Sequence, residues 1–442
     1  MRNPYVITCI LVLGCFAELS AEKKPNVVII YTDDQGSIDA HCYGATDLHT
    51  PNMDRLAETG VRFTQFYAAA AICSPSRAAL LTGLTPLGAG LPGNSPKGKG
   101  GLPAEQVTIA EVLKSHGYST AHIGKWHLGE TEETLPMNQG FDYSFGHMGG
   151  CIDNYSHFFY WAGPNRHDMW ENGREIWMDG EYFPDLMSTK ALRYIDDHKD
   201  VAFFVYYAIN LPHYPYQGTK KWRDHYRDLD EPRNHYAACV STVDERIGIL
   251  LEKLEENGLR ENTIIVFQSD HGHSMETRAF GGGGNSGIYR GAKFSFFEGG
   301  IRVPAIISYP AELPQDVVRD QMAVNTDWLP TILDLCGIHY STDNFEGLSL
   351  EKVIMGNEAS PHEVFCWHQE KDYWAIRKGD WKLLRNPRDP SAKGELTEED
   401  AYFLANIREQ PDEMKNLATR HPEKVEELTK EYENWYKSLL KE

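Results

Sequence analysis

The sequence is poor in positive charge. Its 442 residues include 43 Lys and Arg against 64 Asp and Glu, which gives a formal net charge of −21. General nucleic-acid binding needs a basic face, so this balance argues against that class of partner. Salt screens the long-range repulsion of an anionic ligand beyond about 10 Å. A site for an anion on this chain must therefore create its own local positive field.

Long hydrophobic runs are also scarce. The one clear run, Tyr5–Ala17, precedes the small residues Ser20–Ala21 and is too short to span a bilayer. We interpret 1–21 as a secretory signal peptide, which predicts a secreted or periplasmic protein with no membrane span. As an alternative, the segment ending at Cys15 loosely matches a bacterial lipoprotein box, in which Cys15 would carry the lipid anchor.

Cysteine motifs and nucleotide-binding glycine motifs are missing. Two of the eight cysteines fall in the signal segment, and the other six are widely spaced without a Cys-x-x-Cys pair. Neither a zinc-binding cysteine cluster nor a disulfide scaffold is predicted. The four glycines at 281–284 are not preceded by a strand and followed by a helix in the dinucleotide-binding pattern, so we expect a loop there.

Apolar strands alternate with helical segments through 22–360. This alternation predicts an α/β fold with a large, mostly parallel sheet sandwiched by helices. The predicted strands are Asn26–Tyr31, Val61–Ala69, Ser119–Ile123, Ala202–Ile209 and Thr263–Ser269. The predicted helices are Thr50–Thr59, Cys73–Thr82, Glu105–His116, Asp185–His198 and His235–Glu256.

The pattern changes from about Pro361 onward. Short strands follow one another there, and Pro422 begins a helix that runs to about Leu440. We predict that 361–442 is a C-terminal α+β subdomain, a small antiparallel sheet with one helix, attached to a catalytic domain at 22–360. Its predicted strands are Val364–His368, Tyr373–Arg377 and Trp381–Leu384.

The segment Cys73-Ser74-Pro75-Ser76-Arg77 carries the strongest chemical signal. Pro75 suits the first turn of a helix, and Gly83 ends it. A helix N-terminus offers free N–H donors and the positive end of a dipole, so it favours an anion beside Cys73. Arg77 lies one turn further on and can clamp an oxyanion. The plainer alternative is an ordinary helix start with a buried cysteine.

Acidic residues follow two of the predicted strands. Asp33 and Asp34 follow the first strand, and Asp270 and His271 follow Thr263–Ser269. In a parallel sheet these positions meet at the carboxyl ends of the strands. Three carboxylates favour a hard divalent cation, calcium above magnesium. Taken singly, each Asp is also consistent with a turn or helix cap.

Further basic and imidazole side chains lie in short motifs. Lys125 and His127 alternate along one extended segment and so point the same way. His213 lies between two prolines that fix its loop. Lys293 precedes a Glu-Gly-Gly-Ile-Arg-Val-Pro stretch. A lysine supplies positive charge and a histidine can hold or move a proton, although a solvated lysine or a packed histidine fits each motif alone.

In combination these motifs resemble the type I, formylglycine-dependent sulfatases of the alkaline phosphatase superfamily, in particular arylsulfatases and N-acetylgalactosamine sulfatases. The resemblance extends from about Pro25 to the last helix. It implies that Cys73 is oxidised to formylglycine by a formylglycine-generating or sulfatase-maturating enzyme, and that the hydrated aldehyde supplies the nucleophilic oxygen. The catalytic residues that it implies are Cys73, Arg77, Lys125, His127, His213 and Lys293.

The resemblance also implies one bound calcium ion per chain. Its ligands would be Asp33, Asp34, Cys73, Asp270 and His271. Position 271 is Asn in many members of the family. A histidine there is better suited to zinc, but we retain calcium as the expected metal. Glu298 and Arg302 are expected to pair structurally.

The resulting hypothesis is a sulfatase that acts on a sulfated oligosaccharide or polysaccharide, such as one with galactose or N-acetylhexosamine sulfates at its chain ends. An aromatic segment at 154–170 suits a sugar platform, although we expect half of its candidate residues in the core instead. The candidates are Tyr155, His157, Phe158, Tyr160 and Trp161. Two alternatives remain open. One is a phosphodiester or phosphonate monoester hydrolase of the same superfamily, and the other is a non-catalytic glycan-binding protein.

Overall fold

The computed structural model describes residues 23–95, 100–160, 165–341 and 344–440, so the predicted signal peptide lies outside the described residues. Its main feature is a ten-stranded sheet. In spatial order the strands are β13 (Val317–Arg319), β2 (Val61–Phe63), β12 (Ala305–Ser308), β11 (Thr263–Ser269), β1 (Asn26–Asp33), β10 (Phe203–Pro212), β4 (Ser119–Lys125), β5 (Tyr143–His147), β8 (Trp170–Glu171) and β9 (Arg174–Glu175).

The predicted α/β fold is confirmed, and its parallel part is the centre of this sheet. The five strands from β11 to β5 run parallel. On either side, β12 and β8 pair antiparallel to them. The parallel strands are buried along nearly their whole length, which explains their continuous apolar sequence.

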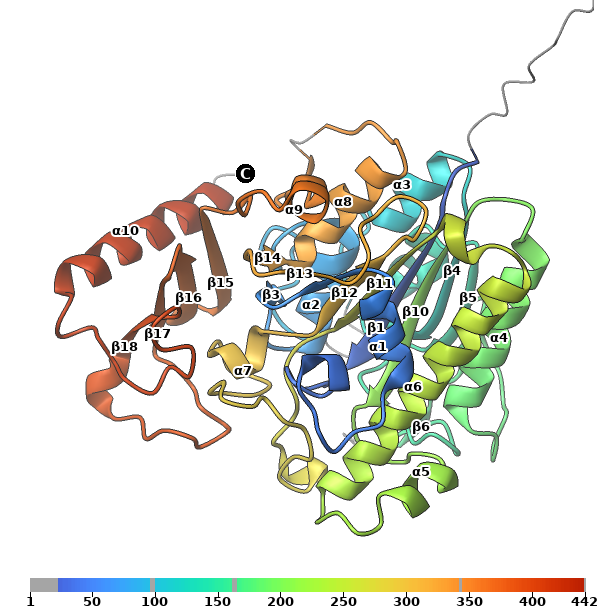
Figure 1. The fold of residues 1–442 in the computed structure, drawn as a ribbon, viewed down its shortest axis with the longest axis horizontal. Helices are drawn as coiled ribbons and strands as arrows, with labels where there is room; N and C mark the ends of the chain where they lie inside the picture. The colour runs from blue at the N-terminus through green and yellow to red at the C-terminus, as the bar shows by residue number, and fades with distance from the viewer. Residues whose placement is uncertain (1–22, 96–99, 161–164, 342–343, 441–442) are drawn as a thin grey trace, which may run out of the picture.

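Helices cover both faces of the sheet (Figure 1). In β1 the side chains alternate: Val27 and Ile29 join one core cluster, while Val28 and Ile30 join the other. The first cluster includes α2 (Cys73–Thr82), α3 (Ile109–Ser115), α8 (Trp328–Leu335) and α9 (Glu351–Gly356). The second includes α1 (Pro51–Glu58), α4 (Phe183–His198), α5 (Lys220–His225) and α6 (Arg233–Glu256).

Short elements complete the main body. β3 (Phe66–Tyr67) pairs with β14 (Ala323–Val324), and β6 (Phe158–Phe159) pairs with β7 (Arg166–His167). The helix α7 (Glu298–Ile301) has a single turn. The 3-10 turns are η1 (His41–Tyr43), η2 (Glu132–Thr134), η3 (Pro136–Asn138), η4 (Arg260–Asn262), η5 (Thr277–Ala279), η6 (Asn325–Asp327) and η8 (Glu398–Ala401). No helix in the described ranges has the length and hydrophobicity to cross a membrane.

Two predicted boundaries were wrong for identifiable reasons. The predicted strand Val61–Ala69 is two strands in different sheets, because the chain turns at Thr64, whose N–H donates to the carbonyl of Arg319. The helix predicted from Glu105 begins instead after Thr108. There the Thr108 hydroxyl accepts from the Glu111 N–H at 3.2 Å, and the Glu111 carboxylate accepts from the Thr108 N–H at 2.8 Å.

The C-terminal part forms a four-stranded antiparallel sheet with the helix α10 (Pro422–Leu439), at the left of Figure 1. One face of the sheet carries Trp367, which packs in a cluster with Phe297 of the main body. The other face carries Ile376, which packs against Leu428 of α10. The strands are β15 (Val364–Glu370), β16 (Tyr373–Lys378), β17 (Trp381–Arg385) and β18 (Tyr402–Asn406), the last of which was not predicted.

Candidate active site

Neighbouring parallel strands bring polar side chains to one edge of the sheet. Asp33 ends β1 and Lys125 ends β4. His213 and Asp270 directly follow β10 and β11. Because these four strands are adjacent, the side chains meet at their carboxyl ends, where ligand sites of such sheets lie. Asp34 follows with φ 62°, a left-handed conformation that aspartate tolerates better than most residues.

The helix α2 begins at this edge, and every residue of it is buried. Ile72, the residue before it, has no side chain that can cap the free N–H groups. Instead the Asn94 side-chain oxygen accepts from the Ser74 N–H at 3.1 Å. Cys73 therefore lies at the positive end of a rigid helix, where an anion is stabilised.

Three carboxylates and an imidazole lie behind Cys73. Ligand atoms of Asp33, Asp34, Cys73 and His271 lie within 4.8 Å of one another. Asp270 Oδ1 accepts from the Asp34 N–H at 3.1 Å and lies 3.6 Å from His271 Nε2. The Nδ1 of His271 donates to the carbonyl of the next residue at 2.9 Å, which leaves Nε2 facing the carboxylates. This set of oxygens and one oriented nitrogen fits a divalent cation.

Three buried basic side chains pair with these carboxylates. Despite them, burial raises the pKa of Asp34 to about 7 against the opposing effect of Lys293. The cluster thus favours a further positive charge, which agrees with the donor set. The pairs are Lys125–Asp33 at 2.7 Å, Lys293–Asp34 at 2.9 Å and Arg77–Asp270 at 2.9 Å.

The same cations act on Cys73. Burial alone would raise the pKa of its thiol, but Lys125 and Lys293 outweigh burial and lower the pKa to about 5. Position 73 is therefore a place where negative charge is stabilised. His127 and His213 respond differently, because burial, the largest cause, holds the pKa of each imidazole well below its usual range. Both rings are neutral at pH 7 when the cavity holds no anion.

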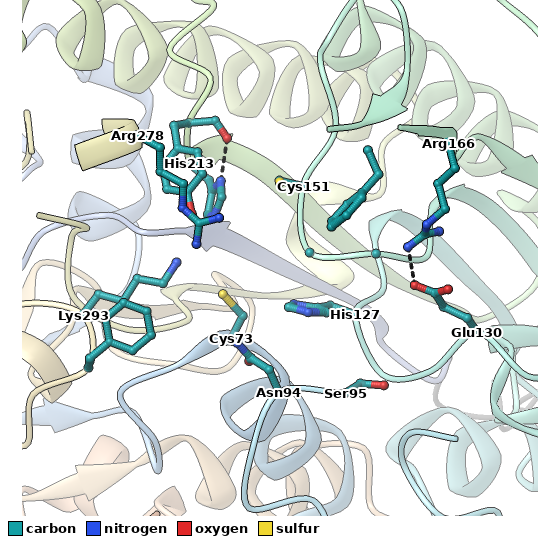
Figure 2. A pocket seen from close by; sticks show the side chains of 15 residues that line it. Cys73, Asn94, Ser95, His127, Glu130, Cys151, Arg166, His213, Arg278 and Lys293 are labelled. Atoms are coloured by element: carbon teal, nitrogen blue, oxygen red, sulfur yellow. Dashed lines mark hydrogen bonds and ion pairs between the residues drawn. The ribbon is translucent and has the colours of Figure 1, made fainter. Parts of the chain in front are cut away.

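A cavity of about 200 Å³ opens onto Cys73. Figure 2 shows the Cys73 side chain between Lys293 on one side and His127 on the other. Arg166, which lies 2.6 Å from Glu130, and Arg278 stand on opposite sides of this view. Lys293, Arg166 and Arg278 all line the cavity, so its lining is locally basic although the chain is acidic.

The predicted site residues occupy two layers. Cys73, His127, His213 and Lys293 line the cavity. The others are buried beneath it, in contact with one another through the ion pairs given above: Asp33, Asp34, Arg77, Lys125, Asp270 and His271. Glu298 and Arg302, expected as a structural pair, lie 3.2 Å apart and away from the cavity lining.

Sequence reasoning missed most of the residues on loops around the cavity. Gly150 shows why such residues matter: a Cβ atom there would lie 3.0 Å from the His127 ring, so glycine lets the loop pack on that ring. Gly150 lies soon after β5, and its place beyond a strand end was the available signal. The lining residues that were missed are Asn94, Ser95, Glu130, Gly149, Gly150, Cys151, Phe159, Arg166, Tyr214, Arg278 and Phe294.

Only part of the expected aromatic platform lines a cavity. Phe158 and Tyr160 line a second cavity of about 630 Å³, which shares Arg278 with the first. Tyr155 instead stacks on Tyr182 with ring centroids 5.1 Å apart. His157 is fully buried, and Trp161 lies outside the described residues.

An α/β fold with a basic cavity over a buried carboxylate cluster is typical of an enzyme that acts on an anionic substrate. Comparisons with known proteins identify the family. Residues 25–338 match the family "Sulfatase", and 284–441 match "N-sulphoglucosamine sulphohydrolase, C-terminal". The chain therefore belongs to the sulfatase family and is a sulfuric ester hydrolase.

Individual relatives agree. The chain is 31% identical to arylsulfatase A of Homo sapiens, across 92% of this chain and 86% of that protein. It is 31% identical to N-acetylgalactosamine-6-sulfatase of Canis lupus familiaris, across 82% and 72% respectively. The crystal structure of Ps i-CgsB in complex with k-i-k-neocarrahexaose superposes with a TM-score of 0.83 at 29% identity and covers 93% of each chain.

Proposed function

We propose that this chain removes sulfate groups from a sulfated carbohydrate, with formylglycine at position 73 and a bound calcium ion. The observation that carries the proposal is the position of Cys73. It lies at a helix N-terminus, on the floor of a small basic cavity, with a buried carboxylate cluster directly behind it. A sulfate group that enters this cavity meets Lys293 beside position 73 and Arg166 and Arg278 in the wall.

Asp33, Asp34, Asp270 and His271 would hold the calcium ion, next to the side chain at position 73. Three carboxylates supply hard oxygen ligands, which suit calcium better than they suit softer metals. When bound, the ion would add positive charge beside a sulfate oxygen and the side chain of residue 73. The raised pKa of Asp34 supports a further cation, because burial of that carboxylate is not fully offset by Lys293.

Formylglycine at position 73, once hydrated, would supply an oxygen nucleophile and a second hydroxyl that a thiol cannot. The surrounding residues prepare this position for negative charge. Lys125 and Lys293 lower the pKa of the Cys73 thiol, and the same two cations would act on a formylglycine hydroxyl at this position. Arg77 Nη2 lies 3.4 Å from Asp33 and 2.9 Å from Asp270, so it keeps both carboxylates in place behind the nucleophile. Charge stabilisation of this kind is usually the largest catalytic contribution.

His213 is the best-placed donor of a proton to the departing alcohol. Its Nδ1 donates to the Tyr214 carbonyl at 2.6 Å, so Nε2 is the atom left for the cavity, and it lies 3.7 Å from Asp34. A neutral His213 accepts at Nε2. A sulfate anion in the cavity favours the imidazolium form, which donates there. His127, on another side of Cys73, is placed to take a proton from residue 73.

A carbohydrate substrate is supported by two kinds of observation. The similar proteins include an N-acetylgalactosamine-6-sulfatase and a protein crystallised with an oligosaccharide. In this chain the second cavity adjoins the first and is lined by Phe158, Tyr160 and the 69%-exposed Phe280. Aromatic faces of this kind suit the apolar face of a sugar ring. We therefore propose that the sugar residue adjacent to the sulfated residue of the substrate binds against these side chains.

The proposal includes three further points. Conversion of Cys73 requires a maturating enzyme as partner. The N-terminal sequence 1–21 supports export to the periplasm or outside the cell. The change at about residue 361 to a separate four-stranded sheet supports a C-terminal subdomain, 361–442, beside a catalytic domain, 22–360.

Matched aryl esters test the reaction. Matured, calcium-loaded protein should hydrolyse an aryl sulfate with a higher kcat/KM than the corresponding aryl phosphate. A preference for the phosphate would overturn the proposal in favour of a phosphoester hydrolase. Defined oligosaccharides with galactose or N-acetylhexosamine sulfates at their ends then test the substrate, because release of sulfate from aryl esters alone would refute the carbohydrate assignment.

A further inference from the structure

A second group of side chains that could bind a metal lies outside the catalytic cavity, beside the antiparallel strand pair β6–β7. Ligand atoms of His157, His167 and Asp179 all lie within 4.8 Å of one another. His157 is fully buried and the His167 side chain is 2% exposed. The Asp179 side chain is 60% exposed, so the group is open to solvent on one side.

Each histidine has one ring nitrogen held by a hydrogen bond and one left over. The Nε2 of His157 donates to the carbonyl of Glu181 at 3.0 Å, because a carbonyl can only accept. The Nδ1 of His167 donates to the Glu175 carboxylate at 3.0 Å. The His157 Nδ1 and the His167 Nε2 are therefore bare lone pairs. Both are buried, and neither has a hydrogen-bond partner within the described part of the chain.

Histidines that bind metals are commonly oriented by a hydrogen bond at the other ring nitrogen, as both of these are. Their far nitrogen usually donates to a carboxylate or carbonyl, which fixes the ring so that the other nitrogen faces the metal. Buried lone pairs without a partner are costly. The His167 Nε2 lies 3.9 Å from Asp179 Oδ1, too long for a hydrogen bond. This separation of 3.9 Å is compatible with both atoms binding one ion at about 2.0–2.2 Å each.

We propose that His157, His167 and Asp179 bind a divalent transition-metal ion of the zinc type. The two imidazoles are borderline ligands that favour zinc over calcium, and zinc also accepts a carboxylate oxygen. The exposed side next to Asp179 leaves the fourth position to water and gives the ion a path of entry. This site differs in chemistry from the cluster behind Cys73, which is dominated by carboxylate oxygens.

The ion would stabilise the segment that carries Arg166 into the lining of the catalytic cavity. His157 directly precedes Phe158 of β6, and His167 directly follows Arg166 of β7. Arg166 lines the catalytic cavity and Phe158 lines the second one. Asp179 lies in the loop between β9 and α4. Trp177 of the same loop stacks on His167 with ring centroids 3.8 Å apart. A bound metal ion would therefore link the strand pair β6–β7 to that loop.

A crystallographic experiment locates the ion directly. Crystals of the full, calcium-loaded protein are soaked with Zn²⁺ and measured at the zinc absorption edge. We expect an anomalous peak at about 2.0–2.2 Å from His157 Nδ1, His167 Nε2 and an Asp179 oxygen. Zinc peaks only elsewhere, or none at this cluster, would overturn the proposal.

Titration in solution tests the same site by affinity. In excess calcium, H167Q should bind one Zn²⁺ fewer than the unsubstituted protein. D179N alters an exposed side chain and so should fold, and it should bind this ion at least about tenfold more weakly. H116Q, a change of an exposed histidine elsewhere, is the control and should leave zinc uptake unchanged. Equal zinc affinity of D179N and the unsubstituted protein would refute the site.

Discussion

Two buried ion clusters in this molecule are built alike but are placed differently. In the first, behind Cys73, Lys293 lies 2.9 Å from Asp34. In the second, between the main body and the C-terminal sheet, Lys382 lies 2.8 Å from Glu298 and 3.1 Å from Glu413. Burial raises the pKa of one carboxyl in each cluster, Asp34 and Glu413, to about 7.

The surroundings separate the two clusters. Lys293 lines the catalytic cavity. Lys382 and its two glutamates are fully buried, and Lys382 joins β17 to α7 and to the loop at Glu413. A shifted pKa therefore occurs both in the proposed catalytic cluster and in a structural cluster of this chain. What distinguishes the first cluster is its access to the cavity beside Cys73, the proposed nucleophile.

The largest expected effect comes from removing the proposed nucleophile. Cys73→Ala should lower kcat/KM for an aryl sulfate by at least about 10⁴-fold, because loss of a nucleophile removes the covalent route. Cys366→Ala makes the same chemical change in the C-terminal sheet and should keep turnover. Steady-state kinetics on both variants decides, and near-normal turnover by the Cys73 variant would remove residue 73 from the mechanism.

Lys382→Met should act on stability alone. It leaves two buried glutamates without their shared cation, which costs about 3–5 kcal/mol of unfolding free energy. The kcat/KM of the folded protein should not change, because the cluster is sealed away from the cavity. Chemical denaturation and kinetics on the same sample measure both. A loss of turnover with unchanged stability would reverse the roles assigned to the two clusters.

The matched change in the first cluster, Lys293→Met, should act on catalysis. Loss of one preorganised positive charge should reduce kcat about 10²–10³-fold. Its effect on unfolding free energy should be smaller than that of Lys382→Met, since calcium would also neutralise Asp34. Equal losses of kcat in the two Lys→Met variants would show that the two clusters do not differ in their role in catalysis.

The pH dependence of stability provides a subtler test of the sealed cluster. Burial raises the pKa of Glu413 from 4.5 to about 7, so the folded state keeps a proton that the unfolded state has released. Its contribution to stability is therefore present below pH 4.5 and is lost as the pH rises toward 7. Glu413→Gln should remove this loss, by up to about 1.4 kcal/mol per pH unit. Parallel unfolding profiles for both proteins from pH 4.5 to 7 would contradict the assignment.

The smallest expected effect concerns the second cavity. Phe280→Ala should lower kcat/KM for a sulfated oligosaccharide by about tenfold at most, because one stacking face contributes roughly 1 kcal/mol. Hydrolysis of a small aryl sulfate, which does not reach that cavity, should not change. Equal losses on both substrates would show that Phe280 acts on the catalytic cavity instead.

Much of the main body follows from the sequence. The apolar strands and the residues that end them, such as Asp33 and Asp270, are adjacent in sequence, so strand-end chemistry can be recognised without a structure. The antiparallel flanks and the strand β18 were not foreseen, because short strands of two to five residues have little periodicity.

The site divides in the same way. Motif residues such as Cys73 and Lys125 were identified because their neighbours define a helix start or a strand end. Arg166, Arg278 and the pair His157–His167 were not, because a two-residue strand, a 3-10 turn and long-range packing bring them to their places. His157 was a candidate for the sugar platform and instead is buried, next to His167 and Asp179.

The mass of the peptide that contains Cys73 tests the proposed chemistry at its origin, when the protein is matured in its native host and assayed in parallel for sulfate release. We expect active protein to carry an aldehyde in place of the thiol, and activity to rise in proportion to the converted fraction. Fully active protein with an unmodified thiol at position 73 would contradict the proposed chemistry.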